Sequence, residues 1–161
     1  MVHGMINKIL VAVDASVPAG CAVGVAVGLA RQLGAQLRMV HVVDSWLARL
    51  PELAVYDDAV LNELRSGGEN ALANACARVP DGVPCERVLL EGDPPETITT
   101  TARDWPADLI VIGSDSHGRL AHFLLGSTAD SVVRRASCPV VTVRATDDLA
   151  GANKTSVAAT V

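Results

Sequence analysis

Short apolar runs alternate along the chain with longer segments in which apolar residues recur at helical spacing. The runs are rich in Val, Leu and Ile and have the length of buried strands. They lie at 8–13, 37–43, 85–91, 109–112 and 139–144. The intervening segments at about 16–33, 55–79, 94–105 and 127–136 have the period of helices. This order predicts an α/β fold, a single doubly wound five-stranded parallel sheet with helices on both faces.

Capping and turn residues predict where the helices begin and end. Either Asp14 or Ser16 is suited to cap the first helix, and Gly34 is suited to end it. Asp93 is followed by two prolines, which are tolerated in the first turn of a helix, so it is expected to cap the third helix. The first strand and the second, 37–43, both end in an aspartate, Asp14 and Asp44, at the carboxyl edge of the predicted sheet.

Two stretches depart from this regular pattern. Gly67 and Gly68 fall inside the second helical segment, and each glycine costs ~1 kcal/mol relative to alanine in a helix, so we expect a kink or a frayed turn there. After Arg144 no period is sustained. We therefore expect one domain over 1–145 and a flexible, mostly disordered tail over 146–161.

The most distinctive polar segment follows the strand at 109–112. Gly113 opens a small polar loop, and Gly126-Ser127-Thr128 then resembles the cap of a helix. Glycine lets a ligand approach the backbone, and a helix N-terminus offers free N–H donors with a partial positive charge. Ligands of parallel sheets usually bind at the carboxyl ends of the strands. The segment therefore predicts an anion site such as a phosphate site, although Gly126-Ser127-Thr128 could also be an ordinary helix cap.

Two common phosphate-binding patterns do not fit this segment. Gly113 and Gly118 have the glycine spacing of a P-loop, but Arg119 and Leu120 stand where that motif requires Lys and then Ser or Thr. The dinucleotide pattern G-x-G-x-x-G does not occur in the chain.

A third pattern matches better. The segment resembles the nucleotide-binding loop of the universal stress protein family, G-x2-G-x9-G-[ST], with Gly113 first and Gly126-Ser127 last. The family's second glycine falls on Ser116, and the available glycine, Gly118, lies two residues later. The resemblance extends from Lys8 to about Arg144 and includes KILVAVDAS, LRMVHVVD and CPVVTVR.

This resemblance implies a Rossmann-like, adenine nucleotide alpha hydrolase-like fold with strand order 3-2-1-4-5, and a site for ATP or another adenine nucleotide. Asp14, which could instead be only a helix cap, is implied to contact the adenine and ribose together with Val42. The residues implied to line the crevice or to bind ribose and phosphates are Ala12, Val13, Ile112, Gly113, Ser114, Ser116, Gly126, Ser127 and Thr128. Three further loop residues, His117, Gly118 and Arg119, are added as candidate phosphate contacts.

Catalytic and metal chemistry have little support in the sequence. His117 and His122 lack a nucleophile or carboxylate at a diagnostic spacing, and His41 lies inside a predicted strand as a core residue. Asp14 or Asp115 could help to hold magnesium with the phosphates, but protein ligands alone do not form a metal site. Three interpretations stay open: a nucleotide-binding signalling module, a slow ATPase, or a stress protein that acts through protein contacts alone.

Composition and charge limit the classes of partner that the protein is expected to bind. A net charge of -5 without basic clusters argues against nucleic acid, and neither a membrane span nor a secretory signal is recognised, so a cytoplasmic protein is expected. The four cysteines are scattered, with no C-x-x-C, and are expected to be buried reduced thiols. By the same family resemblance the last strand, Pro139 to Arg144, is expected to pair with a second copy in a homodimer.

Overall fold

The computed structural model describes residues 5–44, 58–114, 127–145 and 156–160, and their strands form one sheet in the order β3-β2-β1-β4-β5-β6. The first five strands are mutually parallel, which confirms the predicted fold class and the order 3-2-1-4-5. The strands are β1 (Lys8–Ala12), β2 (Gln36–Asp44), β3 (Cys85–Gly92), β4 (Leu109–Gly113), β5 (Val140–Arg144) and β6 (Ser156–Thr160).

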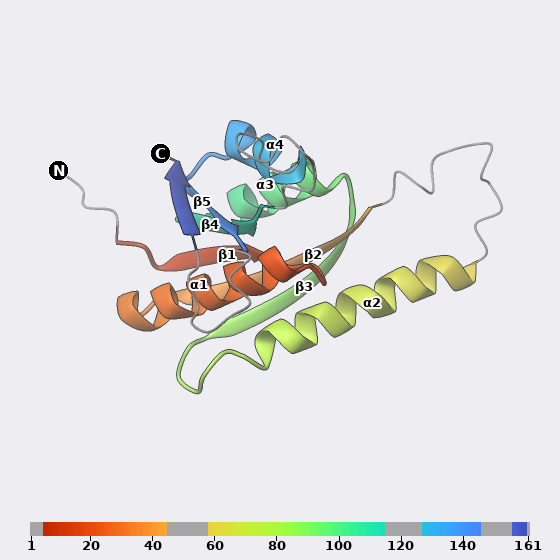
Figure 1. Cartoon of the computed structure of the whole chain (residues 1–161), viewed down its shortest axis with the longest axis horizontal. Coiled ribbons are helices and arrows are strands. Elements are labelled where there is room, and N and C mark those ends of the chain that lie inside the picture. Colours follow the sequence, from red (N-terminus) through yellow and green to blue (C-terminus); the bar gives the residue numbers. More distant parts are fainter. Residues whose placement is uncertain (1–4, 45–57, 115–126, 146–155, 161) are drawn as a thin grey trace.

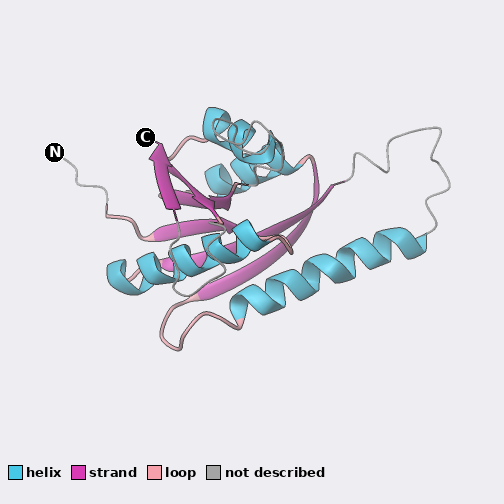
Figure 2. Ribbon diagram, in the orientation of Figure 1, coloured by secondary structure: helices cyan, strands magenta, loops and turns pink. Residues whose placement is uncertain are grey.

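Helices cover both faces of the sheet (Figures 1 and 2). They are α1 (Val17–Leu33), α2 (Asp58–Cys76), α3 (Pro94–Asp104) and α4 (Ser127–Arg135). Alternate strand residues point to opposite faces: Ile9 and Val11 belong to an apolar cluster under α1 and α2, while Leu10 belongs to the cluster under α3 and α4. Because both faces are buried, β1 and β4 are continuous apolar runs and do not alternate with polar residues.

Local capping chemistry follows the sequence closely. Ser16, and not Asp14, is the N-cap of α1, since its Oγ accepts a hydrogen bond from the Ala19 N–H at 3.3 Å. Gly34 ends the same helix with a left-handed φ of 68°. Asp93 caps α3 by accepting from the Glu96 N–H at 3.1 Å, as predicted.

The interruption expected at Gly67-Gly68 is wrong, because α2 runs through both glycines without a break. A Cβ on Gly68 would lie 2.5 Å from His41 Cδ2 and 2.7 Å from Leu89 Cδ1. The glycine therefore lets α2 approach β2 and β3 closely, and the packing gained outweighs its poor helix propensity.

The expectation of a disordered tail is also wrong for residues 156–160, which form β6 antiparallel to β5, while 146–155 and 161 lie outside the described residues. The edge of β5 offers unpaired backbone groups, and β6 satisfies them from Val140↔Thr160 to Arg144↔Ser156. The edge that was expected to pair with a second copy is therefore already covered. A homodimer through Pro139–Arg144 stays a prediction, and it would require β6 to leave this edge.

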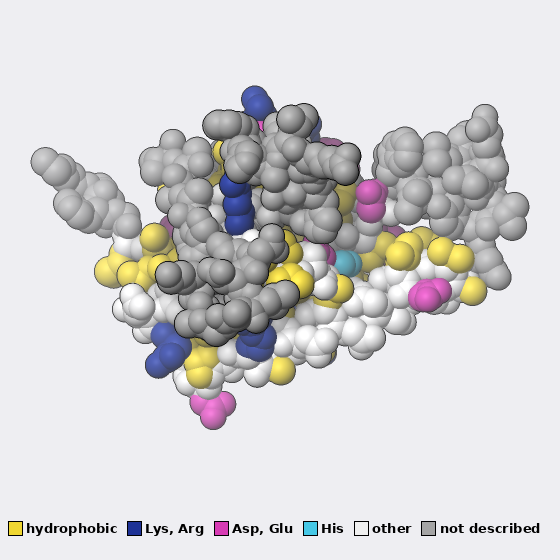
Figure 3. Space-filling model, viewed as in Figure 1, with side chains coloured by type: hydrophobic (Ala, Val, Ile, Leu, Met, Phe, Trp, Pro, Cys, Tyr) yellow, Lys and Arg dark blue, Asp and Glu magenta, His cyan; other side chains and the backbone are white. Residues whose placement is uncertain are grey.

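Two properties of the described residues concern a membrane span and a basic surface. No helix within the described ranges combines the length and hydropathy that a bilayer crossing requires. On the face seen in Figure 3, the described Lys and Arg side chains are separated from one another and do not form a single basic patch.

Candidate functional site

A cavity of about 180 Å³ opens at the carboxyl ends of β1, β2 and β4. Sequence-predicted residues from four separate segments line it: Ala12, Val13, Asp14, Val42, Ile112, Gly113 and Thr128. Five further lining residues were not predicted as part of the site: Ala19, Val40, His41, Pro94 and Ile98. The fold thus brings together residues that lie more than a hundred positions apart in the chain.

Asp14 supplies the carboxylate of this cavity. Its side chain is exposed, and Oδ1 accepts the Ser16 N–H at 2.7 Å, which fixes the turn between β1 and α1. Because Ser16 caps the helix, the second carboxylate oxygen of Asp14 has no partner among the described residues. This oxygen can accept a hydrogen bond from an amino or hydroxyl group of a ligand.

His41 corrects a prediction, because it is half-buried at the cavity and is not a core residue. Its Nδ1 lies 2.8 Å from the carbonyl oxygen of Val13. A carbonyl can only accept, so this hydrogen bond requires the proton on Nδ1. His41 therefore holds the backbone that leads to Asp14. The same imidazole ring lies against Gly68 of α2.

The first turns of three helices meet at the cavity, through Ala19 of α1, Pro94 of α3 and Thr128 of α4. The N-terminal end of each helix has a partial positive charge, so the three together favour an anionic ligand. The sequence predicted only the contribution of α4, because the positions of α1 and α3 depend on how the helices pack.

Gly113 has a structural role that its place in a loop motif did not reveal. A Cβ at this position would lie 2.6 Å from both Ala19 N and Pro18 C, which are backbone atoms of α1. Glycine therefore allows the first turn of α1 to rest on the end of β4. The adjacent Ser114 is buried, and its Oγ has no hydrogen-bond partner among the described residues.

The family model of the universal stress protein family matches residues 5–144 of the chain. The chain belongs to this family. It is 33% identical over 148 residues to the universal stress protein YxiE of Bacillus subtilis, covering 87% of this chain and all of YxiE. The family assignment agrees with the resemblance seen in the sequence.

Solved structures of universal stress proteins have the same fold. A universal stress protein in complex with cAMP is 25% identical with a TM-score of 0.66, covering 86% of this chain and 97% of that one. A universal stress protein from Archaeoglobus fulgidus in complex with dAMP is 25% identical with a TM-score of 0.62, covering 86% of this chain and 98% of that one.

Among the other predicted contacts of this universal stress protein, Ser127 is described by the structure. Ser127 is the first residue of α4 and is exposed. The remaining predicted contacts, Ser116, His117, Gly118, Arg119 and Gly126, lie outside the described residues, as do Asp115 and His122. Over the ranges that are described, no three His, Cys, Asp or Glu side chains gather in a way that could hold a metal ion.

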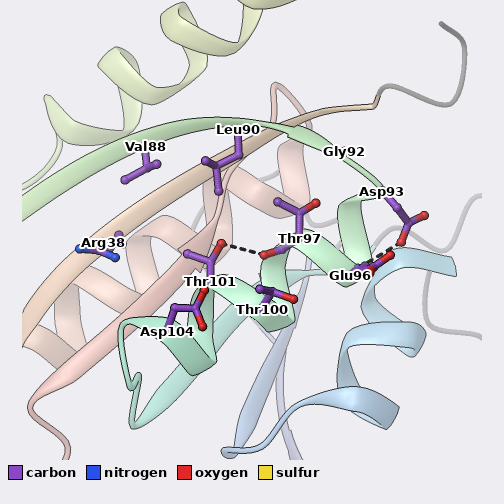
Figure 4. A pocket seen from close by; sticks show the side chains of 10 residues that line it. All are labelled: Arg38, Val88, Leu90, Gly92, Asp93, Glu96, Thr97, Thr100, Thr101 and Asp104. Atoms are coloured by element: carbon purple, nitrogen blue, oxygen red, sulfur yellow. Dashed lines mark hydrogen bonds between the residues drawn. The ribbon is translucent and has the colours of Figure 1, made fainter. Parts of the chain in front are cut away.

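A larger cavity of about 620 Å³ lies between β3 and α3 (Figure 4). Val88 and Leu90 of β3 face threonines of α3, and the acidic residues at its margin are Asp93, Glu96 and Asp104. Among the described residues that line it, the cationic one is Arg38, which is bound to Glu86 at 2.7 Å and lies over the Trp105 ring at 4.6 Å from the centroid. The larger cavity is therefore less suited to an anion than the smaller one.

Proposed function

We propose that this universal stress protein binds an adenine nucleotide in the cavity beside Asp14 and acts as a stress-response binding or signalling module in the cytoplasm. The base and ribose would lie against Asp14, Val42 and Ile112. The phosphates would extend toward Ser114 and the N-terminus of α4. The observation that carries the proposal is that one cavity gathers seven of the residues predicted from the sequence for such a ligand.

The polar groups around the cavity fit a nucleotide. The Asp14 carboxylate oxygen that has no partner among the described residues matches the amino group of adenine or a ribose hydroxyl. Buried hydroxyl groups are normally hydrogen-bonded, so the unpartnered Ser114 Oγ supports a ligand or loop partner at this end of β4. The three helix N-termini supply positive potential without any lysine clamp.

Binding without fast catalysis is the form of activity that the described residues support. The described lining of the cavity includes one carboxylate, and Nδ1 of His41 donates to the Val13 carbonyl. Phosphoryl transfer ordinarily requires a cationic clamp with bound metal, and neither is formed by the described lining residues. The related proteins whose structures contain cAMP and dAMP support adenine as the recognised base.

The first test is the nucleotide content of the purified protein, released by heat and separated chromatographically. Calorimetric titration of ATP, AMP and cAMP into the stripped protein then measures affinity and identifies the preferred phosphate state. The Asp14→Asn variant should bind more weakly, while Asp93→Asn, another aspartate between a strand and a helix, should bind as the parent does. A stripped protein that is folded and gives no heat with any of these nucleotides would rule out the proposal and favour function through protein contacts.

A further inference from the structure

Two cysteine thiols that are nine positions apart in the sequence face each other in the fold. Cys76 is the last residue of α2 and Cys85 is the first residue of β3, and their Sγ atoms are 3.6 Å apart. Cys85 is exposed and Cys76 is half-buried, so a small oxidant can reach the pair. The residues between them form the turn that joins α2 to β3 at the lower left of Figure 1.

The approach of the two sulfur atoms is fixed by the surrounding fold. Cys76 is anchored by the end of α2, and its carbonyl accepts the Val79 N–H at 3.0 Å. Cys85 pairs with Leu37 of β2, and the preceding Pro84 carbonyl accepts the Leu37 N–H at 2.8 Å. Both cysteines are therefore held by elements that form independently of any bond between them.

The other two cysteines have no such neighbour. Cys21 packs against the apolar cluster under α1 and α2, and Cys138 packs against the cluster on the opposite face of the sheet. In the described part of the chain, Cys76–Cys85 is the one thiol pair in contact.

We propose that Cys76 and Cys85 form a reversible oxidation site, which a peroxide converts to an intramolecular disulfide. The Cys76 sulfur attacks one peroxide oxygen and releases water, which leaves a sulfenic acid. The Cys85 sulfur then attacks the oxidised sulfur and displaces a second water, so two thiols and one hydrogen peroxide give one disulfide and two waters. Closing the gap to a disulfide bond of about 2.05 Å requires a change of about 1.5 Å, which side-chain rotation can supply.

The order of the two steps follows from the environment of Cys85. Partial desolvation of its Sγ, followed by the hydrogen bond and the charge of Cys76, raises the pKa of this thiol to about 12. Cys85 is therefore protonated at neutral pH and is a poor first target. Oxidation of Cys76 removes the hydrogen bond and the charge of its thiol, which are two of the three causes that raise the Cys85 pKa. The Cys85 thiol then ionises more readily for the second step.

This site is independent of nucleotide binding. Cys85 begins its strand, so the pair lies toward the amino ends of the parallel strands, whereas the Asp14 cavity lies at their carboxyl ends. The disulfide would join the end of α2 to the edge strand β3 across a short loop. It should stabilise the fold by restricting the unfolded chain and leave nucleotide affinity unchanged.

The test oxidises the reduced full-length protein with hydrogen peroxide under native conditions, followed by alkylation, intact mass measurement and peptide mapping. We expect a loss of about 2 Da before alkylation, corresponding to two hydrogens, and two fewer alkyl groups than the reduced control after it, with a linked peptide that contains Cys76 and Cys85. Dithiothreitol should restore all four thiols. The oxidised protein should melt several degrees above the reduced protein.

Matched serine variants decide which thiols react. Cys76→Ser and Cys85→Ser should each abolish the intramolecular bond, whereas the double variant Cys21→Ser with Cys138→Ser should form it like the parent. Addition of oxygen without a linked peptide, a link that includes Cys21 or Cys138, or a disulfide that lowers the melting temperature would each overturn the proposal.

Discussion

Two strand-to-helix junctions of this protein have the same kind of sequence and different uses. After β1, Asp14 precedes α1, and after β3, Asp93 precedes α3. Asp93 is itself the N-cap, and its Oδ2 accepts the Glu96 N–H. Asp14 lies two residues before the N-cap Ser16, and its Oδ1 accepts the Ser16 N–H. Each aspartate thus engages one oxygen within the described chain, and the two differ in the cavity that they line, the smaller one for Asp14 and the larger one for Asp93.

The glycines that end β4 and β3, Gly113 and Gly92, also differ. A Cβ on Gly113 would meet the backbone of α1, whereas a Cβ on Gly92 would meet the side chain of Thr97, with Oγ1 at 2.6 Å. Gly92 has a φ of 152°, so its backbone conformation disfavours other residues. Gly113 is therefore constrained by tertiary packing. Gly92 is constrained by its local backbone conformation and by a side chain that can move.

The largest effect is expected from Gly113→Ala. The new methyl group meets backbone atoms that cannot rotate away, so the free energy of unfolding should fall by about 3 kcal/mol. Gly92→Ala should cost about 1 to 2 kcal/mol, since Thr97 can change rotamer and strain at one residue remains. Urea denaturation of both variants measures the difference. An equal loss in the two variants would show that α1 can shift away from β4.

Nucleotide affinity should separate the two aspartates. Asp14→Asn removes a charged acceptor from the cavity, so the dissociation constant for the preferred adenine nucleotide should rise at least about tenfold. Asp93→Asn should change it by less than about twofold, because asparagine is an equally good N-cap. Calorimetry on folded, stripped proteins provides the comparison, and equal weakening in both variants would remove Asp14 from the site.

The free energy of unfolding should rank the two aspartates in the opposite order to nucleotide affinity. Asp93→Ala and Ser16→Ala should each lower the free energy of unfolding by about 1 kcal/mol, because each removes an N-cap acceptor. Asp14→Ala should cost about half as much, since it loses only the hydrogen bond from Ser16. Chemical denaturation monitored by circular dichroism measures all three. A loss at Asp14 larger than that at Ser16 would mean that Asp14 is the main stabilising residue of this junction.

The smallest effect is expected from threonine hydroxyls. Thr128 lines the smaller cavity in the first turn of α4, so Thr128→Val should weaken nucleotide binding about threefold through loss of one neutral hydrogen bond. Thr100 lines the larger cavity, and Thr100→Val should leave nucleotide affinity unchanged. If Thr100→Val is the variant that weakens binding, the nucleotide occupies the cavity between β3 and α3.

Most of the sheet and several site residues could be predicted from sequence alone. Apolar runs of strand length, Ser16, Gly34 and Asp93 act through neighbours in the chain, so periodicity and capping rules are sufficient to find them. The family resemblance then implied Asp14, Val42 and Thr128 as site residues, and in the structure these three residues line one cavity. The role of that cavity in nucleotide binding stays a prediction.

Other features were decided by tertiary structure. Gly68 was expected to interrupt a helix and instead allows that helix to pack on His41 and Leu89. Residues 156–160 have too little pattern of their own to predict a strand, and they form one because the edge of β5 supplies the partner. The contact between Cys76 and Cys85 depends on how a helix returns to the sheet. Each of these features depends on contacts between segments, whereas sequence patterns record mainly what a segment favours by itself.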